Sequence, residues 1–436
     1  MKIENLQFFK IHNYYLFTCS IYILLYIFIT PPFYVADEYS HFQKSASKEN
    51  IYLRGALSID NGIKKFSDHF ENLAFNKWKN NREYKYSKNI PHNYKNNYKL
   101  ENSLTSANLA SLSGYPVSGY FISKIAVNIS TIFTNDVIKI FYLGRFANFL
   151  FCVIICWFVL KEIPRGKEYL YIILSMPMTL TLFGSYNQDA MLFSFTLLII
   201  FFVNKIKNET VKIDTRLIII QIITLLLIMG RPTYLTFFLM PFFLILNYSK
   251  YKTRQLFIFF LIACFTLIFI KTYPTPVISN SIKFPGDIIK VLIIISNDIY
   301  INLFKYIALM IGGLGRIDLI VNYYSIIFIS LCIVYFYFFK INYKNLFSKF
   351  NIIIFLIFVS TISLTLLSQY MYFTNHGQTK FISGVQGRYF IPVFLLLTLS
   401  INKLKNNELN YIKKTILFVV PHINLFVLYE YYNFFY

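Results

Sequence analysis

Charged residues are scarce in this sequence. They make up 14% of the 436 residues, whereas a soluble domain usually carries about 25%. Hydrophobic residues make up 56%, and the mean hydropathy is +0.51. This excludes a disordered chain, because disorder requires low hydrophobicity. The composition predicts an integral membrane protein rather than a string of soluble domains.

Several chemical signatures are also missing. The five cysteines all lie in apolar runs, which predicts buried thiols and no disulfide framework. There is no glycine-rich nucleotide loop, paired-cysteine zinc spacing or serine-nucleophile elbow. No internal repeat is evident, which disfavours a repeat-built transporter. The net charge of +22 would suggest nucleic acid in a soluble protein, but in a membrane protein basic loop residues set topology.

Apolar segments predict an all-α integral membrane protein with about 11 transmembrane helices, in a range of about 10–13, because each span needs about 20 mostly apolar residues. The segments are 14–30, 141–160, 170–183, 190–203, 217–229, 234–246, 256–270, 323–339, 352–367, 389–401 and 415–432. Several are short, so we expect neighbouring helices to shield them. Residues 1–436 are predicted to form a single polytopic domain.

Two longer segments separate these helices, at 31–139 and 271–322. Within the second, 288–313 is apolar but interrupted by Asn297, Asp298, Asn302 and Lys305, which favours an interfacial amphipathic helix. Within the first, 45–108 has no strong period and is expected to be a mobile flap or an ordered cap. Residues 114–134 predict an amphipathic helix.

The distribution of Lys and Arg predicts a cytoplasmic N-terminus. With this orientation, short loops that carry Lys161, Lys205, Lys250 and Lys344 face the cytoplasm, as the positive-inside rule requires. Both long segments are then extracytoplasmic. The polar residues that are costly in a membrane gather at that same face, which usually marks a site. They are Asp37, Glu38, His41, Arg145, Asn187, Gln188, Asp189, Arg231, Gln386, Arg388 and Tyr389.

Asp37, Glu38 and His41 follow Pro31-Pro32, where the chain turns at the membrane surface. On a helix, Asp37 and His41 would share one face. A carboxylate there can act as a general base towards an acceptor hydroxyl, and a nearby histidine can orient it or ligate a metal. The alternative is a charge pair that the helix dipole favours.

The remaining charged residues each have a structural alternative. Arg145 either snorkels to the headgroups or pairs with a buried carboxylate. Asp189 either caps a helix or pairs with an arginine. Arg231 lies in a plain turn or points into a cavity, and Arg388 follows glycines that let a ligand approach the backbone. Three arginines at one face suit a phosphate-bearing, membrane-bound substrate.

The ordered motifs resemble a bacterial family of predicted membrane proteins of unknown function, grouped with GT-C-type glycosyltransferases. The matching residues are Pro32 to Glu38 with His41-Phe42, Gly114-Tyr115-Pro116, Tyr142 to Arg145 with Asn148, Ser185 to Ala190, Arg231 to Tyr234, Gly312 to Asp318, and Gly384 to Pro392. The chain departs from the expected pattern at Ala36, in place of proline, and at Arg316, in place of an aromatic residue.

The resemblance implies a GT-C-like fold in the bacterial cytoplasmic membrane, with an extracytoplasmic active site. It implies transfer of a sugar, with inversion, from a polyprenyl-phosphate carrier. Asp37 would be the base, with Glu38 as neighbour or alternate, and Arg231 and Arg388 would hold the carrier phosphate. Arg145, Asn187, Asp189, Tyr234, Gln386 and Tyr389 complete the candidate substrate site. No cofactor is implied; Asp37 and His41 permit a divalent metal, but two residues do not make a metal site.

The sequence therefore predicts a membrane glycosyltransferase whose acceptor is a cell-surface glycan or glycolipid. Its partners would be the polyprenyl-phosphate sugar donor, that acceptor and the lipid bilayer, and not nucleic acid. A polysaccharide repeat-unit polymerase or a lipid-linked glycan flippase is the alternative, because the arginines suit either. A structural membrane protein is the third hypothesis.

Overall fold

The computed structural model describes residues 10–47, 57–80, 98–107, 117–208, 212–272, 288–338, 348–374, 382–401 and 410–436. Most of these residues are helical, with two small antiparallel sheets. The predicted all-α membrane architecture is confirmed. The Gly114-Tyr115-Pro116 motif lies outside the described residues.

Each of the eleven predicted spans is occupied by one helix or by two or three successive helices. The continuous ones are α1 (Ile11–Ile29), α6 (Val137–Glu162), α9 (Gln188–Asn208), α10 (Ile213–Gly230), α12 (Lys252–Thr272), α14 (Tyr323–Phe338), α15 (Lys349–Phe373) and α17 (Asn410–Phe435), while η6 (Pro232–Phe238) runs into α11 (Leu239–Tyr248). Seven helices of the described chain have the length and apolar composition to cross a membrane.

Two spans are broken, and both are buried within the protein. One consists of α7 (Lys167–Leu174) and α8 (Pro177–Phe183), and the other of η8 (Gly387–Phe390), α16 (Ile391–Leu396) and η9 (Leu397–Ser400). A broken helix at membrane depth needs other partners for its free backbone groups. At the first break, the Ser175 carbonyl accepts a hydrogen bond from Asn424 Nδ2 of α17 at 3.0 Å. The expected shielding of short spans is therefore present.

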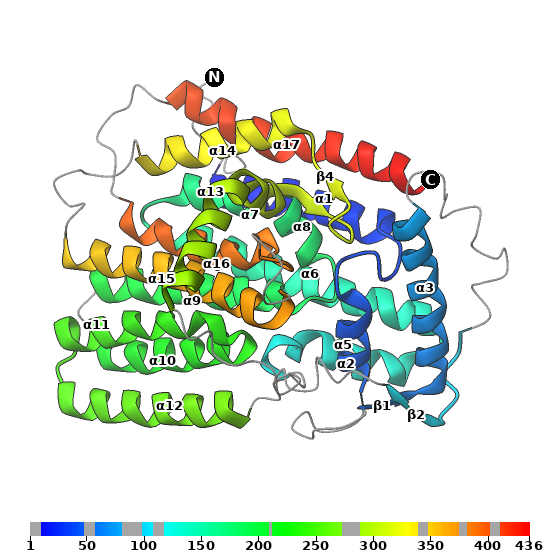
Figure 1. The fold of residues 1–436 in the computed structure, drawn as a ribbon, viewed down its shortest axis with the longest axis horizontal. Coiled ribbons are helices and arrows are strands. Elements are labelled where there is room, and N and C mark those ends of the chain that lie inside the picture. Colours follow the sequence, from blue (N-terminus) through cyan, green and yellow to red (C-terminus); the bar gives the residue numbers. More distant parts are fainter. Residues whose placement is uncertain are drawn as a thin grey trace.

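The long helices share one direction (Figure 1). Helices α9, α10 and α12 pack in succession, and α1 packs against both α6 and α17. Helices α2 (Glu38–Ala46) and α3 (Asn61–Asn80) stand across this direction at one end of the bundle, where the C-terminus also lies. We call this the α3 end.

Helix α13 (Ile288–Gly312) is a single continuous helix. It runs at an angle to the long helices in Figure 1, yet its residues 292–312 are also long and apolar enough to cross a membrane. Its one buried carboxylate, Asp298, accepts hydrogen bonds from Asn302 Nδ2 (2.9 Å), the Ile382 amide (3.0 Å) and the Tyr306 hydroxyl. The interfacial placement of this helix stays a prediction.

The described part of the first long segment is an ordered cap, and the expectation that it lacks periodicity was wrong. Strand β1 (Leu57–Asp60) pairs with β2 (Leu104–Ala107), and Asp60 accepts hydrogen bonds from the amide of Gly62 at the start of α3 and from two amides just before β2. Helix α3 follows β1 and buries Ile63, Phe66, Phe70 and Ala74 on one face, the spacing of an amphipathic helix. The surrounding Lys and Asn residues hid this stripe in the sequence.

Helix α5 (Phe121–Phe133) confirms the predicted amphipathic helix, although it begins later, after η5 (Val117–Gly119). It packs against α6 and α2, buries Ser123, Val127 and Ser130, and turns its apolar side outward, with Phe133 81% exposed. All five cysteines are free thiols. Cys264 is exposed, contrary to the predicted burial, because it lies on the outer face of α12.

Candidate functional site

The turn between α1 and α2 separates two adjacent carboxylates. Asp37 precedes α2 with φ of +67°, in the left-handed region, which Asp and Asn tolerate better than most residues. Its side chain is 52% exposed, whereas that of Glu38 is completely buried. Consecutive carboxylates therefore occupy different environments and have different partners.

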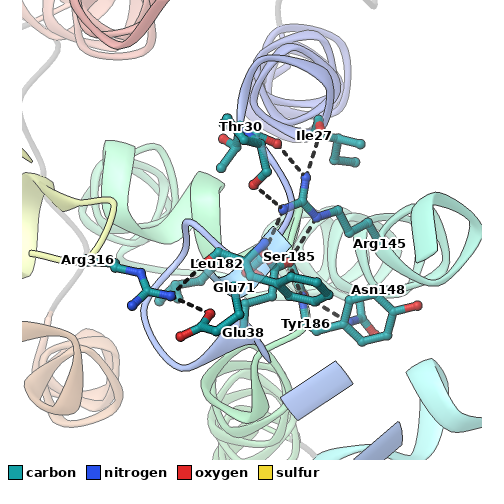
Figure 2. Close-up of polar contacts among 12 residues, drawn as sticks. Ile27, Thr30, Glu38, Glu71, Arg145, Asn148, Leu182, Ser185, Tyr186 and Arg316 are labelled. Carbon is teal, nitrogen blue, oxygen red and sulfur yellow. Dashed lines mark hydrogen bonds and ion pairs between the residues drawn. The ribbon is translucent and has the colours of Figure 1, made fainter. Parts of the chain in front are cut away.

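Glu38 and Arg145 form a closed, buried pair. Arg145 Nε and Nη2 donate to the two Glu38 oxygens at 2.9 and 2.6 Å. Its remaining donors reach the carbonyls of Ile27, Thr30 and Pro31 at the end of α1. Glu38 also accepts from the amides of Phe33 and Tyr186. Figure 2 shows Arg145 between Glu38 and the end of α1.

This network decides between the two alternatives for Arg145, which pairs with a buried carboxylate rather than snorkelling. It joins the end of α1, the turn before α2, helix α6 and the segment before α9. Both Glu38 oxygens and the Arg145 donors are engaged within the protein. The geometry favours a structural role for Glu38 and Arg145 rather than contact with substrate.

Four other charged residues form a second group, a row of alternating acidic and basic side chains that we call the Asp37–Arg231 network. Arg388 Nη2 lies 2.5 Å from Asp37 Oδ2, and its Nε lies 3.0 Å from Asp189 Oδ2. Asp189 Oδ1 lies 2.9 Å from Arg231 Nη2. Asp189 therefore pairs with two arginines, and Arg231 is part of a charged cluster rather than of a plain turn. Asp37 is the exposed end of the Asp37–Arg231 network.

Neighbouring residues hold the arginines in place. Arg231 lies 3.7 Å above the Tyr389 ring centroid, and the Tyr234 hydroxyl donates to the Tyr389 carbonyl at 2.9 Å. Gly387 permits the close approach of α13, because a Cβ there would lie 2.1 Å from the Met310 nitrogen. Asn187, rather than Asp189, caps α9 by accepting the Asp189 amide at 2.8 Å.

Burial and nearby charges shift the pKa values of Asp37 and of the neighbouring, buried His41. Burial opposes the charge of Asp37, but the guanidinium groups of Arg388 and Arg231 outweigh it and lower the pKa of that carboxyl. Burial lowers the pKa of His41 to about 4. His41 Nδ1 lies 2.7 Å from the Tyr120 hydroxyl. Within the described chain, no group of three His, Cys, Asp or Glu side chains is placed to hold a metal.

Because His41 is buried as a neutral ring, its protonation should couple to stability. The unfolded state takes up a proton below pH 6.5 whereas the folded state does not until about pH 4, so His41 makes stability rise with pH across this window. We expect about 2 kcal/mol less stability at pH 5 than at pH 7 from this residue. Thermal unfolding of purified protein measures it. His41→Gln should flatten the difference, and an unchanged pH dependence in that variant would exclude this role.

Sequence reasoning missed several residues at the α3 end. Glu71, Phe75 and Trp78 of α3 line an open cavity of about 360 Å³ together with Asp37 and Gln386. Their spacing of four and three residues marks one helix face, so a periodicity search of 61–80 would have found them. Arg316 appeared only as a departure from a motif, and Tyr120 only as part of an amphipathic pattern.

One family model matches the chain, over residues 20–397, and its description is a predicted membrane protein, DUF2142. The chain belongs to the DUF2142 family. The match includes Asp37, Asp189, Arg231 and Arg388 and so contains the whole Asp37–Arg231 network. The DUF2142 description assigns no activity, and the GT-C resemblance is not confirmed by it. No curated protein and no solved structure matches the chain.

Proposed function

We propose that this DUF2142 protein is a membrane glycosyltransferase that takes a sugar from a polyprenyl-phosphate carrier at the α3 end, which faces the extracytoplasmic side. The observation that carries the proposal is the Asp37–Arg231 network of ion pairs. It places an exposed carboxylate directly on a buried arginine, with a second arginine behind it. A transferase of this kind needs a base and a phosphate-binding cation side by side.

An apolar groove, lined in part by Phe390 two residues after Arg388, supports a lipid-linked donor. Phe390 and Phe394, which follow Arg388 along the chain, line a cavity of about 310 Å³ with residues of α13 and α15. The α13 and α15 residues at the groove are almost all hydrophobic, including Leu303, Ile307, Ile362 and Leu366. A carrier phosphate at Arg388 would therefore have a place for the first part of its isoprenoid chain.

The proposed reaction is a single displacement. The acceptor hydroxyl oxygen attacks the anomeric carbon of the donor sugar, and the bond from that carbon to the phosphate oxygen breaks. The electron pair stays on the polyprenyl phosphate, and the hydroxyl proton passes to Asp37. One displacement inverts the anomeric configuration. Arg388 and Arg231 stabilise the charge that develops on the departing phosphate.

The resting contact between Asp37 and Arg388 gives a reason for donor binding to come first. While Arg388 holds Asp37, the low pKa of this carboxyl makes it a weak base. A phosphate that draws Arg388 away would leave Asp37 more basic and free to face the acceptor. In this way the donor itself would activate the base.

The surface glycan of cells that lack the protein tests the class of reaction. A transferase predicts glycans that lack one sugar and are restored by the wild-type protein but not by Asp37→Asn. Glycans that stop at a single repeat unit would instead identify a polymerase. Accumulation of a complete lipid-linked glycan on the cytoplasmic side would identify a flippase, and an unaltered glycan would contradict all three.

Filling the apolar groove should weaken donor binding. Ile362→Trp inserts a large ring where the isoprenoid chain is proposed to lie, and we expect the KM for a polyprenyl-phosphate sugar to rise roughly tenfold, about 1.4 kcal/mol. Ile352→Trp on the same helix is the control, because Ile352 is exposed and outside the groove. Equal donor KM values in both variants would remove the groove from the proposal.

A further inference from the structure

The cavity beside Asp37 has an aromatic wall. Phe75 and Trp78 of α3 line it, and their ring centroids lie 5.6 Å apart. They are 44% and 47% exposed. Its volume of about 360 Å³ is within the usual range for small-molecule sites, about 300–1,000 Å³.

These two rings are not needed for the packing of α3. The helix already buries Ile63, Phe66 and Phe70 on an adjacent face. A membrane-facing anchor would also expose aromatic rings. However, Phe75 and Trp78 line the same cavity as Asp37. Their position therefore favours contact with a ligand that reaches Asp37.

The cavity also has polar lining residues, Glu71 of α3 and Arg316 among them. Arg316 pairs with Glu71 of α3, as Figure 2 shows. It belongs to a tight turn in which Gly315 and Ile317 both have positive φ, and this turn is joined to the α1–α2 segment by the hydrogen bond from the Ala36 amide to the Gly315 carbonyl at 3.0 Å. The cap and the turn are thus held on either side of Asp37.

Polar atoms of the lining residues keep unused hydrogen-bonding capacity. Among the described residues, the buried Arg316 Nε and Gln386 Oε1 have no hydrogen-bond partner. A buried polar atom without a partner is costly, and a small rotation of the Arg316 or Gln386 side chain towards the cavity would let a ligand hydroxyl pair with it. The cavity combines an aromatic wall, a charged pair with a spare donor, and a spare amide oxygen.

We propose that this cavity binds the acceptor through a pyranose ring, with the C–H face of the sugar on Trp78 and Phe75 and its hydroxyls at Glu71, Arg316 and Gln386. One hydroxyl then points to Asp37. This rests on the proposed function, because it makes Asp37 the base for that hydroxyl. It assigns the acceptor to the saccharides and adds Glu71, Phe75, Trp78 and Arg316 to the site.

Tryptophan fluorescence tests saccharide binding without any transfer reaction. The chain has two tryptophans, Trp78 and Trp157, so full-length Trp157→Phe protein in nanodiscs reports on Trp78 alone. We expect a saturable change in emission when at least one simple methyl pyranoside is added from a panel of common hexoses and amino sugars. A polyprenyl-diphosphate glycan in the same nanodiscs provides a second arm, which distinguishes a lipid-linked acceptor from a free one.

Variants identify the residues responsible. Phe75→Ala in the Trp157→Phe background should weaken saccharide binding about tenfold, whereas Phe133→Ala, an exposed aromatic on α5, should not. Binding that is retained in Asp37→Asn while transfer is lost would separate this site from the reaction. Absence of any response in both arms, with folded protein, overturns the proposal, and so does an equal effect of the Phe133 variant.

Discussion

Under the proposed function, Asp37→Asn should strongly reduce transfer while leaving the protein folded. We expect kcat to fall by about 10²–10⁴-fold, the usual contribution of a general base, because the amide cannot accept the hydroxyl proton. Asparagine keeps the shape of the side chain and tolerates the positive φ at this position. The comparison is kcat of purified wild-type and variant protein with a polyprenyl-phosphate sugar.

Two controls make the Asp37 result specific. Glu101→Gln removes an exposed carboxylate of the cap that pairs with Lys65, and it should leave kcat unchanged. The thermal unfolding temperature of Asp37→Asn should stay close to that of the wild type, because Arg388 keeps Asp189 and the lost partner is half exposed. Full activity in well-folded Asp37→Asn would exclude Asp37 as the base.

Glu38→Gln should have the opposite outcome and destabilise the fold. Breaking a buried ion pair by neutralising one partner costs about 3–5 kcal/mol, and Arg145 is completely buried. We expect a lower unfolding temperature in detergent and less protein in the membrane. Lys65→Gln, which neutralises one partner of an exposed pair, is the matched control and should cost at most about 1 kcal/mol.

A double replacement tests whether the Glu38–Arg145 pair is needed for its charges or for its hydrogen bonds to the backbone. Apolar substitution of both partners of a buried ion pair is often neutral or stabilising. Here the pair also satisfies the carbonyls of Ile27, Thr30 and Pro31 and the amides of Phe33 and Tyr186. We therefore expect Glu38→Leu with Arg145→Met to stay destabilised. Recovery of wild-type stability would mean that Glu38→Gln is destabilised only by the unpaired charge of Arg145, and that the hydrogen bonds to the backbone are dispensable.

The contrast between Asp37 and Glu38 shows where sequence reasoning stops. The sequence places two carboxylates together after Pro31-Pro32 but cannot say which one faces the cavity. That choice depends on the positive φ at Asp37 and on Arg145, which lies more than a hundred residues away. Likewise, the sequence put Asp189, Arg231 and Arg388 at one face, but their pairing depends on the packing of α9, η6 and η8.

The spans themselves were predictable, because hydropathy alone locates segments that must leave water. Even the short segments 170–183 and 389–401 were placed correctly, and their burial explains how they are accommodated. The cap was not predictable in the same way. Most residues of α3 are polar, and the face with Glu71, Phe75 and Trp78 lines a cavity only because the turn at Arg316 packs against it.

A structure of the protein with undecaprenyl phosphate in nanodiscs tests the central claim most directly. We expect the phosphate to lie within hydrogen-bonding distance of Arg388 and Arg231, and the isoprenoid chain to lie in the groove between α13 and α15. We also expect Asp37 to be released from Arg388. A phosphate bound elsewhere, with the Asp37–Arg388 contact intact, would contradict it.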